Sequence, residues 1–240
     1  MADPAPNPIY VAVDTPDLNR ATALSAALAD VAGGIKLGLE FFTANGVKGV
    51  HQVARASGLP VFLDLKFHDI PNTVAGAVRA ACETAPGIVN VHAIGGRTMM
   101  TAAAQAADEG ARIHAVTRPL VIAVTVLTSM DQTDMVECGI VRPVADQVRE
   151  LAILTRDSGL DGVVCSAHEA AMIRAACGPD FKLIVPGVRP AWAGTDDQKR
   201  IMTPAEAIAA GADILVIGRP VTGAEDPVAA CRRILAELPK

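Results

Sequence analysis

The sequence lacks the features that mark membrane proteins, secreted proteins and general nucleic-acid-binding proteins. No apolar run approaches the roughly 20 residues that span a bilayer, although 51% of the residues are hydrophobic. Residues 1–8 contain prolines and an acid, but neither the basic nor the apolar segment of a signal peptide. The formal net charge of -5 argues against general binding to nucleic acid or anionic membranes, while leaving room for a local phosphate pocket. We therefore expect a soluble, cytoplasmic protein with no nucleic-acid or membrane partner.

Cysteine and metal-binding patterns are also scarce. The cysteines form an odd set of five with neither a CxxC pair nor a Cys/His ligand spacing: Cys82, Cys138, Cys165, Cys177 and Cys231. There is no HExxH motif and no cluster of acids without accompanying lysines. We expect reduced thiols, as in cytoplasmic proteins, and no metal site.

Hydrophobic periodicity predicts eight strands that alternate with eight helices. We expect strands at residues 10–14, 34–38, from 61 onward, 88–92, 120–127, 161–165, 182–185 and 213–217. The helices are expected at residues 18–31, 41–57, 71–83, 97–108, 142–158, 167–176, 204–210 and 227–238. No change in composition marks a linker between domains.

This alternation predicts an α/β fold of the TIM (β/α)8 barrel type, because eight βα units in 240 residues match the length of that fold. A doubly wound sheet is the competitor, but it usually has fewer strands and a glycine-rich first turn. Here the first turn is Asp14-Thr15-Pro16-Asp17. We predict a short tail at residues 1–8 and a single barrel domain at residues 9–240.

Polar residues gather where the predicted strands end, which is where TIM barrels place their chemistry. These positions hold Asp14, Lys36, Asp64, Lys66, Asp69, His92, Thr128, Ser129, Arg189, Gln198, Gly218 and Arg219. The opposite ends of the strands carry few charged or polar residues by comparison. Solvated loop ends are the ordinary explanation for such residues, but a polar set confined to one face predicts an active site there.

The third predicted strand carries both an acid and a base. Side chains alternate along a strand, so Phe62, Asp64 and Lys66 share one side. Burying charge is costly unless the charge is paired or used. An ordinary ion pair at a strand end is the alternative, but Asp69 adds a third charge one turn later. Perturbed charges of this kind are typical of functional sites.

Two regions suit a phosphate group. Gly218-Arg219 follows strand eight, where this fold usually binds phosphate, and an Arg fork supplies paired hydrogen bonds. The preceding loop, residues 186–200, holds Arg189, Trp192, Gly194 and Gln198 and is long enough to act as a lid or to be a plain surface loop. His68 and His92 lie nearby, and we expect them to be structural.

Residues 64–73 (DLKFHDIPNT) resemble the signature of the orotidine 5′-phosphate decarboxylase family. The similarity extends to residues 124–129 (VTVLTS), 186–190 (PGVRP), 198–204 (QKRIMTP) and 216–220 (VIGRP). The resemblance implies a TIM barrel, a homodimer, and conversion of orotidine 5′-monophosphate to UMP and CO2 without a metal or organic cofactor. Residues 191–197 match the family least well.

The resemblance also implies a role for each matched residue. Lys66 would donate a proton to C6 of the pyrimidine, and Asp64 would lie beside the departing carboxylate. Lys36 would complete the charged array and touch the ribose, while Asp14 would hold a ribose hydroxyl. Asp69 and Thr73 would reach the neighbouring subunit's site. The remaining positions would bind the base (Thr128, Ser129) and the phosphate (Arg189, Gln198, Gly218, Arg219).

Two alternatives fit parts of the pattern. The first is a Mg²⁺-dependent sugar-phosphate decarboxylase or aldolase of the same barrel superfamily, which resembles this chain in the Asp-x-Lys-x-x-Asp pattern at residues 64–69. Those relatives carry a carboxylate at the end of strand two, where this chain has Lys36, whose charge would repel a divalent ion. The second is a nucleotide-binding barrel without catalysis.

Overall fold

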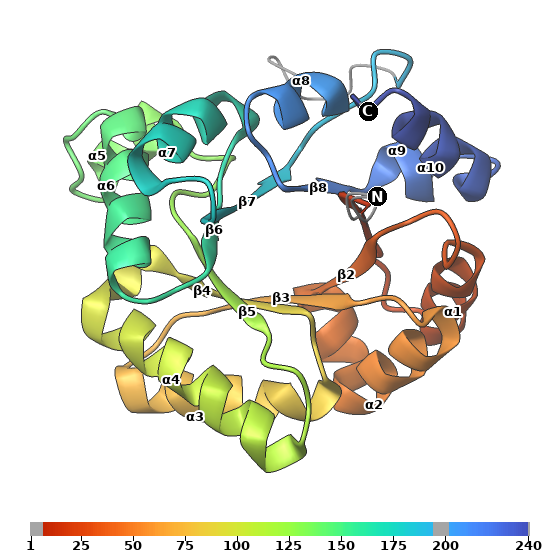
Figure 1. Cartoon of the computed structure of the whole chain (residues 1–240), viewed down its shortest axis with the longest axis horizontal. Helices are drawn as coiled ribbons and strands as arrows, with labels where there is room; N and C mark the ends of the chain where they lie inside the picture. The colour runs from red at the N-terminus through yellow and green to blue at the C-terminus, as the bar shows by residue number, and fades with distance from the viewer. Residues whose placement is uncertain (1–6, 194–201, 240) are drawn as a thin grey trace, which may run out of the picture.

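Eight parallel strands close into a barrel in the computed structural model, which describes residues 7–193 and 202–239 (Figure 1). The first strand pairs with both the second and the eighth, and this pairing closes the ring. The strands are β1 (Ile9–Ala12), β2 (Gly34–Gly38), β3 (Val61–Phe67), β4 (Ile88–His92), β5 (Leu120–Val124), β6 (Gly162–Val164), β7 (Lys182–Pro186) and β8 (Ile214–Ile217). The predicted TIM barrel is confirmed.

Helices surround the strands on the outside of the ring (Figure 1). They are α1 (Leu18–Ala27), α2 (Leu39–Ser57), α3 (Pro71–Ala81), α4 (Gly96–His114), α5 (Gln132–Glu137), α6 (Val144–Asp157), α7 (Ala170–Cys177), α8 (Pro204–Ala209), α9 (Arg219–Thr222) and α10 (Pro227–Ala236), with 3-10 turns η1 (Cys82–Thr84), η2 (Ala93–Gly95) and η3 (Ala167–Glu169). Within the described ranges, no helix combines the length and apolar character needed to cross a membrane.

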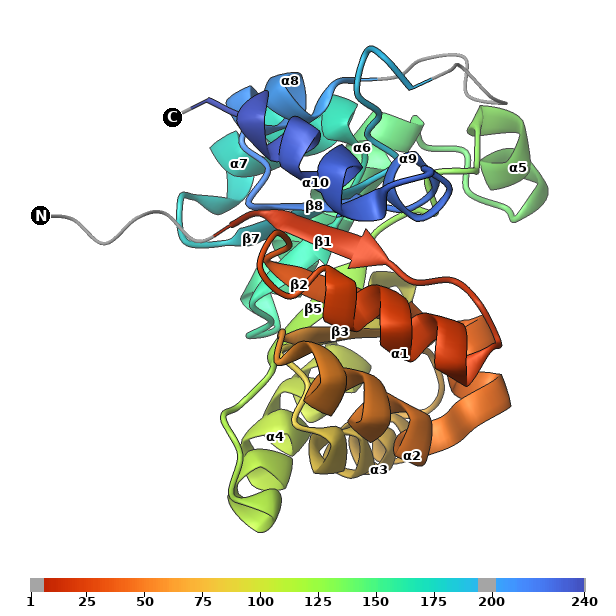
Figure 2. The ribbon, with the colours of Figure 1, turned by 90° about the vertical axis from the view of Figure 1, so that its right-hand side faces the viewer.

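The structure departs from the predicted elements after β5. That strand ends at Val124 rather than at residue 127, and the chain then turns into α5, a short helix that was expected to be loop. Asp131 caps α5 by accepting hydrogen bonds from Thr133 N and Asp134 N. Figure 2 shows α5 at the end of the barrel toward which β1 points. The short α9, which begins at Arg219, was also missed.

Two apolar layers fill the space inside and outside the ring of strands. The barrel interior is closed by buried residues of six strands: Ala12, Phe62, Ile88, Ile122, Ile184 and Val216. A larger cluster lies between the strands and the helices and includes Phe41, Met99 and Met100. The interior layer makes the barrel a packed core rather than a pore, and it forms the floor beneath the carboxyl ends of the strands.

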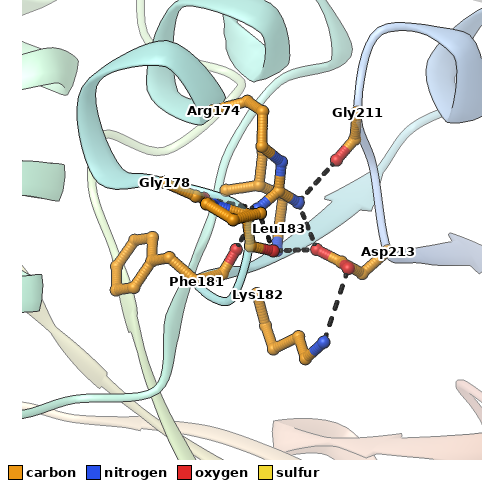
Figure 3. A network of polar contacts seen from close by, with 8 residues as sticks. Arg174, Gly178, Phe181, Lys182, Leu183, Gly211 and Asp213 are labelled. Carbon is orange, nitrogen blue, oxygen red and sulfur yellow. Dashed lines mark hydrogen bonds and ion pairs between the residues drawn. The ribbon is translucent and has the colours of Figure 1, made fainter.

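Two aspartates in corresponding positions join neighbouring strands at the amino-terminal end of the barrel. Asp213, just before β8, accepts from Leu183 N of β7 at 2.8 Å and from Arg174 Nη2 at 2.6 Å (Figure 3). The Arg174 guanidinium also donates to the carbonyl oxygens of Gly178, Pro179, Phe181 and Gly211. Asp161, just before β6, accepts from Val121 N of β5 at 2.7 Å and from Arg118 at 2.8 Å. Each carboxylate therefore joins two neighbouring strands at the end opposite the predicted site.

Candidate active site

Two adjoining cavities open at the carboxyl end of the barrel. The first, of about 300 Å³, is lined by Asp14, Gly187, Arg189, Gly218 and Arg219, among others. The second, of about 210 Å³, is mostly apolar and is lined by Phe62, Lys66, Val126, Leu127 and Thr128, among others. Lys36, Asp64, Pro186 and Val216 line both cavities. One elongated molecule can therefore extend across the two.

A row of four alternating charges lies where the cavities meet. Lys36 Nζ is 2.8 Å from Asp14 Oδ1 and 3.6 Å from Asp64 Oδ2. The other oxygen of the same carboxylate, Asp64 Oδ1, is 2.6 Å from Lys66 Nζ. Lys36 is buried, with a side chain only 10% exposed, whereas Asp14 at the end of the row is 56% exposed. Each ammonium is thus held by a carboxylate, which offsets the cost of removing these charges from water.

The pairing of β2 with β3 brings the charges of this row together. Gly38, at the end of β2, lies opposite Asp64 of β3 in the parallel pairing. A Cβ atom on Gly38 would lie 3.0 Å from Lys36 Nζ and 3.2 Å from Asp14 Oδ1. The glycine therefore leaves the space in which the lysine and the aspartate meet, a role that sequence reasoning missed.

β3 is irregular at its carboxyl end. Its register against β4 shifts between Leu63 and Phe67, so the strand does not follow the regular alternation expected from the sequence. Lys66 has a φ of 51°, in the left-handed region that residues with a side chain rarely adopt. Phe62, Asp64 and Lys66 nevertheless line the same cavity, as predicted.

The charges around Asp64 decide its ionisation. Burial alone would raise the pKa of this carboxyl, but the positive charges of Lys36 and Lys66 and the hydrogen bonds from Lys66 and Asn90 outweigh it. The pKa of Asp64 therefore lies below its ordinary value, and the carboxylate is ionised at neutral pH.

The two histidines lie beside these cavities rather than in them. The rings of His68 and His92 are 5.5 Å apart and line a separate, mainly apolar cavity of about 250 Å³. Burial lowers the pKa of His92, and the positive charges of His68 and Lys66 lower it further. His92 is thus neutral at neutral pH.

The structure brings most of the predicted residues together: Asp14, Lys36, Asp64, Lys66, Thr128, Arg189, Gly218 and Arg219 all line the two cavities. Ser129 is exposed in the turn after β5 and is not among the lining residues. Gln198 and Gly194 lie outside the described residues. Trp192, expected in the lid, lies against α10, where its Nε1 donates to Glu237 Oε1 at 2.8 Å.

Asp69 and Thr73 lie apart from both cavities, at the junction of β3 and α3. Both are exposed, and Asp69 Oδ1 accepts from Ile70 N at 2.6 Å. Ile70 between them is 68% exposed. Neither residue contributes to the charge row of its own chain.

One residue in contact with the charge row was not predicted. Asn90, in the middle of β4, is fully buried and hydrogen-bonds to both Asp64 and Lys66. The signal was available, because an amide interrupts the otherwise apolar run of residues 88–91. Over the described ranges, no group of three or more His, Cys, Asp or Glu side chains is arranged to hold a metal ion.

Comparisons with known proteins agree with this geometry. A model of the "Orotidine 5'-phosphate decarboxylase / HUMPS family" matches residues 7–234. A protein of Rhodospirillum rubrum named orotidine 5'-phosphate decarboxylase is 60% identical over 238 residues, which cover 99% of this chain and 96% of that protein. One of the same name from Moorella thermoacetica is 53% identical over 98% of this chain and 93% of that protein.

Solved structures place the chain in the same group. The crystal structure of orotidine 5'-phosphate decarboxylase from Lactobacillus acidophilus superposes with a TM-score of 0.83 at 34% identity, covering 98% of this chain and 100% of that chain. The sequence match spans nearly the whole barrel, and the predicted residues at the carboxyl ends of its strands converge on one pair of cavities. The chain belongs to the orotidine 5'-phosphate decarboxylase / HUMPS family.

Proposed function

We propose that this chain is an orotidine 5′-phosphate decarboxylase, a cytoplasmic carboxy-lyase that converts orotidine 5′-monophosphate (OMP) to UMP and CO2 in pyrimidine biosynthesis. The observation that carries the proposal is the row Asp14–Lys36–Asp64–Lys66 at the meeting point of the two cavities. The relatives that share 53–60% of its residues over nearly their full length bear this name.

The two cavities suggest how the nucleotide lies. The first cavity holds Arg189 and Arg219 beside Gly187 and Gly218, a set suited to a phosphate, because guanidinium groups make paired hydrogen bonds with phosphate oxygens. The second is mostly apolar and ends at Lys66, which suits a planar pyrimidine. Lys36 lines both cavities and Asp14 lines the first beside it, so the pair is placed to meet the ribose hydroxyls.

The chemistry needs a cation at one carbon atom. Loss of CO2 from C6 leaves an electron pair on a carbon with no conjugated electron sink, and the ammonium of Lys66 offsets that charge and then donates a proton to the carbon. Unit charges about 4 Å apart attract by roughly 4 kcal/mol at an effective dielectric constant of 20, which corresponds to about a thousandfold in rate. No cofactor is required for this step.

Asp64 serves the reaction in two ways. Its carboxylate holds the Lys66 ammonium at 2.6 Å, so the cation is in place before the substrate arrives. The same negative charge opposes the carboxylate of the substrate, and this opposition ends when CO2 leaves. Lys36 on the other side, at 3.6 Å, keeps Asp64 ionised while it does so.

We propose that the active form is a homodimer in which Asp69 and Thr73 complete the neighbouring subunit's site. Both residues are exposed and line neither cavity of their own chain, although they follow the strand that carries Asp64 and Lys66. The exposed Ile70 between them supplies an apolar contact for a second subunit.

The test is the loss of orotate absorbance when the protein is mixed with OMP. We expect turnover that is unchanged by EDTA, because Lys36 stands where the Mg²⁺-dependent relatives carry a metal-binding carboxylate. Activity abolished by EDTA and restored by Mg²⁺ would favour a Mg²⁺-dependent sugar-phosphate decarboxylase or aldolase. UMP binding without any loss of OMP would indicate a nucleotide-binding barrel without catalysis.

A further inference from the structure

Asn90 bridges the two central residues of the charge row from the neighbouring strand. Its Oδ1 accepts a hydrogen bond from the backbone N–H of Lys66 at 2.7 Å, and its Nδ2 donates to Asp64 Oδ1 at 2.7 Å. A backbone N–H can only donate and an ionised carboxylate can only accept, so the two contacts fix the orientation of the amide. Asn90 is fully buried, and neither cavity is lined by it.

The hydrogen bond to Lys66 lies where β3 leaves its regular pairing with β4. The register between β3 and β4 shifts between Leu63 and Phe67, which takes Lys66 out of the regular strand pairing. The left-handed backbone of Lys66, with φ of 51°, is unfavourable for a residue with a side chain. Such a conformation persists only where the surroundings impose it, and the Asn90 carbonyl oxygen satisfies the N–H that this turn of the backbone exposes.

We propose, on the basis of the proposed function, that Asn90 is a positioning residue for decarboxylation: it holds the Lys66 backbone turned toward the substrate cavity and fixes the Asp64 carboxylate against the Lys66 ammonium. It acts through these two residues and does not touch the substrate. Its loss therefore lowers kcat and leaves the binding of UMP, which depends on the phosphate and ribose contacts, largely unchanged.

Two variants distinguish this positioning role from a contribution to the stability of the fold alone. Asn90→Ala removes both hydrogen bonds, and a displacement of the reacting groups by about 1 Å can cost about 100-fold in rate. Asn90→Asp keeps an oxygen for the Lys66 N–H but sets a second carboxylate against Asp64. Two adjacent carboxylates share one proton with a raised apparent pKa, and that proton resides on residue 90, since Lys36 and Lys66 stabilise ionised Asp64.

The protonated acid in Asn90→Asp has the donor and the acceptor of the original amide. Its kcat is therefore expected to rise as the pH falls, relative to wild type. The titratable groups near this position are Lys36 on β2, Asp64, Lys66 and His68 on and after β3, and His92 on β4, while β5 places Ile122 beside it. Asn90→Ala retains all of these groups, so it is the matched control and should show no such recovery.

The experiment measures kcat for OMP against pH, and the dissociation constant of UMP at neutral pH, in wild type, Asn90→Ala and Asn90→Asp. Thr155→Val serves as a stability control: Thr155 is fully buried on α6, and its Oγ1 donates to Leu151 O at 2.7 Å, away from the site. We expect about a 100-fold loss of kcat in Asn90→Ala, a change in UMP affinity below about threefold, and wild-type kcat in Thr155→Val.

Wild-type kcat in Asn90→Ala, or equal losses of UMP affinity and kcat, would overturn the inference. If Asn90→Ala does not fold, the pH profile of Asn90→Asp decides, and a profile parallel to that of wild type would count against it. A wild-type protein that leaves OMP unchanged would instead remove the proposed function, and with it this role for Asn90.

Discussion

Replacing Asp64 by asparagine removes one negative charge from the centre of the site and changes little else. The carboxylate lies 2.6 Å from Lys66 Nζ and 3.6 Å from Lys36 Nζ. Lys36 keeps a second carboxylate, Asp14, at 2.8 Å. Lys66 has no other carboxylate within ion-pair distance among the residues that the structure describes. The substitution therefore frees the Lys66 ammonium, which the proposed mechanism needs, and leaves Lys36 paired with Asp14.

The distances set the size of the effect. At an effective dielectric constant of 20, the two attractions amount to about 6 kcal/mol for Lys66 and about 5 kcal/mol for Lys36. The cost of burying Asp64, whose side chain is 13% exposed, opposes this sum. Removing one partner of a buried pair usually costs about 3–5 kcal/mol of stability. We expect kcat to fall at least about 100-fold, because the freed lysine no longer points at C6.

Ground-state binding should change in the opposite direction. In the proposed mechanism, Asp64 repels the carboxylate that OMP carries and UMP lacks. In Asp64→Asn, OMP should therefore bind at least about tenfold more tightly, a gain of about 1.4 kcal/mol, while the affinity for UMP stays nearly the same. Rapid-mixing absorbance gives kcat and OMP binding, and calorimetry gives UMP binding. Unchanged kcat, or OMP binding that weakens in step with UMP binding, would refute the reasoning.

Three other expectations follow from the same contacts. Mixing Asp69→Ala subunits with Lys66→Ala subunits should regain activity in hybrid dimers, whereas either variant alone should not; no regain would mean that each subunit works by itself. Asp213→Asn should lower the free energy of unfolding by about 1–3 kcal/mol and Tm by about 2–12 °C, because the carboxylate accepts hydrogen bonds from Arg174 and from Leu183 N of β7. Its kcat should be unchanged, and a reduced kcat would show that the two ends of the barrel are coupled. Because the pKa of Asp64 is lowered in the folded chain, its stabilising effect is present above the ordinary carboxyl pKa of about 4 and is lost as the pH falls below it. The stability advantage of wild type over Asp64→Asn in urea unfolding should shrink toward acid, and an advantage that grows there would contradict the assignment.

Much of the barrel could be predicted from the sequence, because its strands and helices obey simple periodicities. The apolar run at residues 88–91 and the segment Gly34–Gly38 became strands at the expected places, and Pro71 begins α3 as its fixed φ favours. The convergence of Asp14, Lys36, Asp64 and Lys66 also followed from the sequence, since parallel strands in a closed barrel end at one face.

The details that depend on contacts between strands could not be predicted in this way. The left-handed backbone of Lys66 arises from a register shift against β4, and periodicity within β3 carries no trace of it. The amide of Asn90 interrupts an apolar run in the sequence, but its partners Lys66 and Asp64 lie on the neighbouring strand and follow only from the pairing of β3 with β4. Thr125, Val126 and Leu127 continued the β-strand composition of β5, yet the strand ends at Val124, and Thr125 Oγ1 donates to Val164 O where the chain leaves the sheet.

The most direct test of the account is the turnover of saturating OMP by Lys66→Ala, measured beside wild type and with UMP binding as proof of an intact site. Loss of the ammonium removes about 4 kcal/mol of attraction to the carbanion, and loss of the proton donor removes a further 10²–10⁴-fold, so we predict a fall in kcat of about 10⁵-fold or more. Turnover within tenfold of wild type, in a variant that still binds UMP, would contradict it.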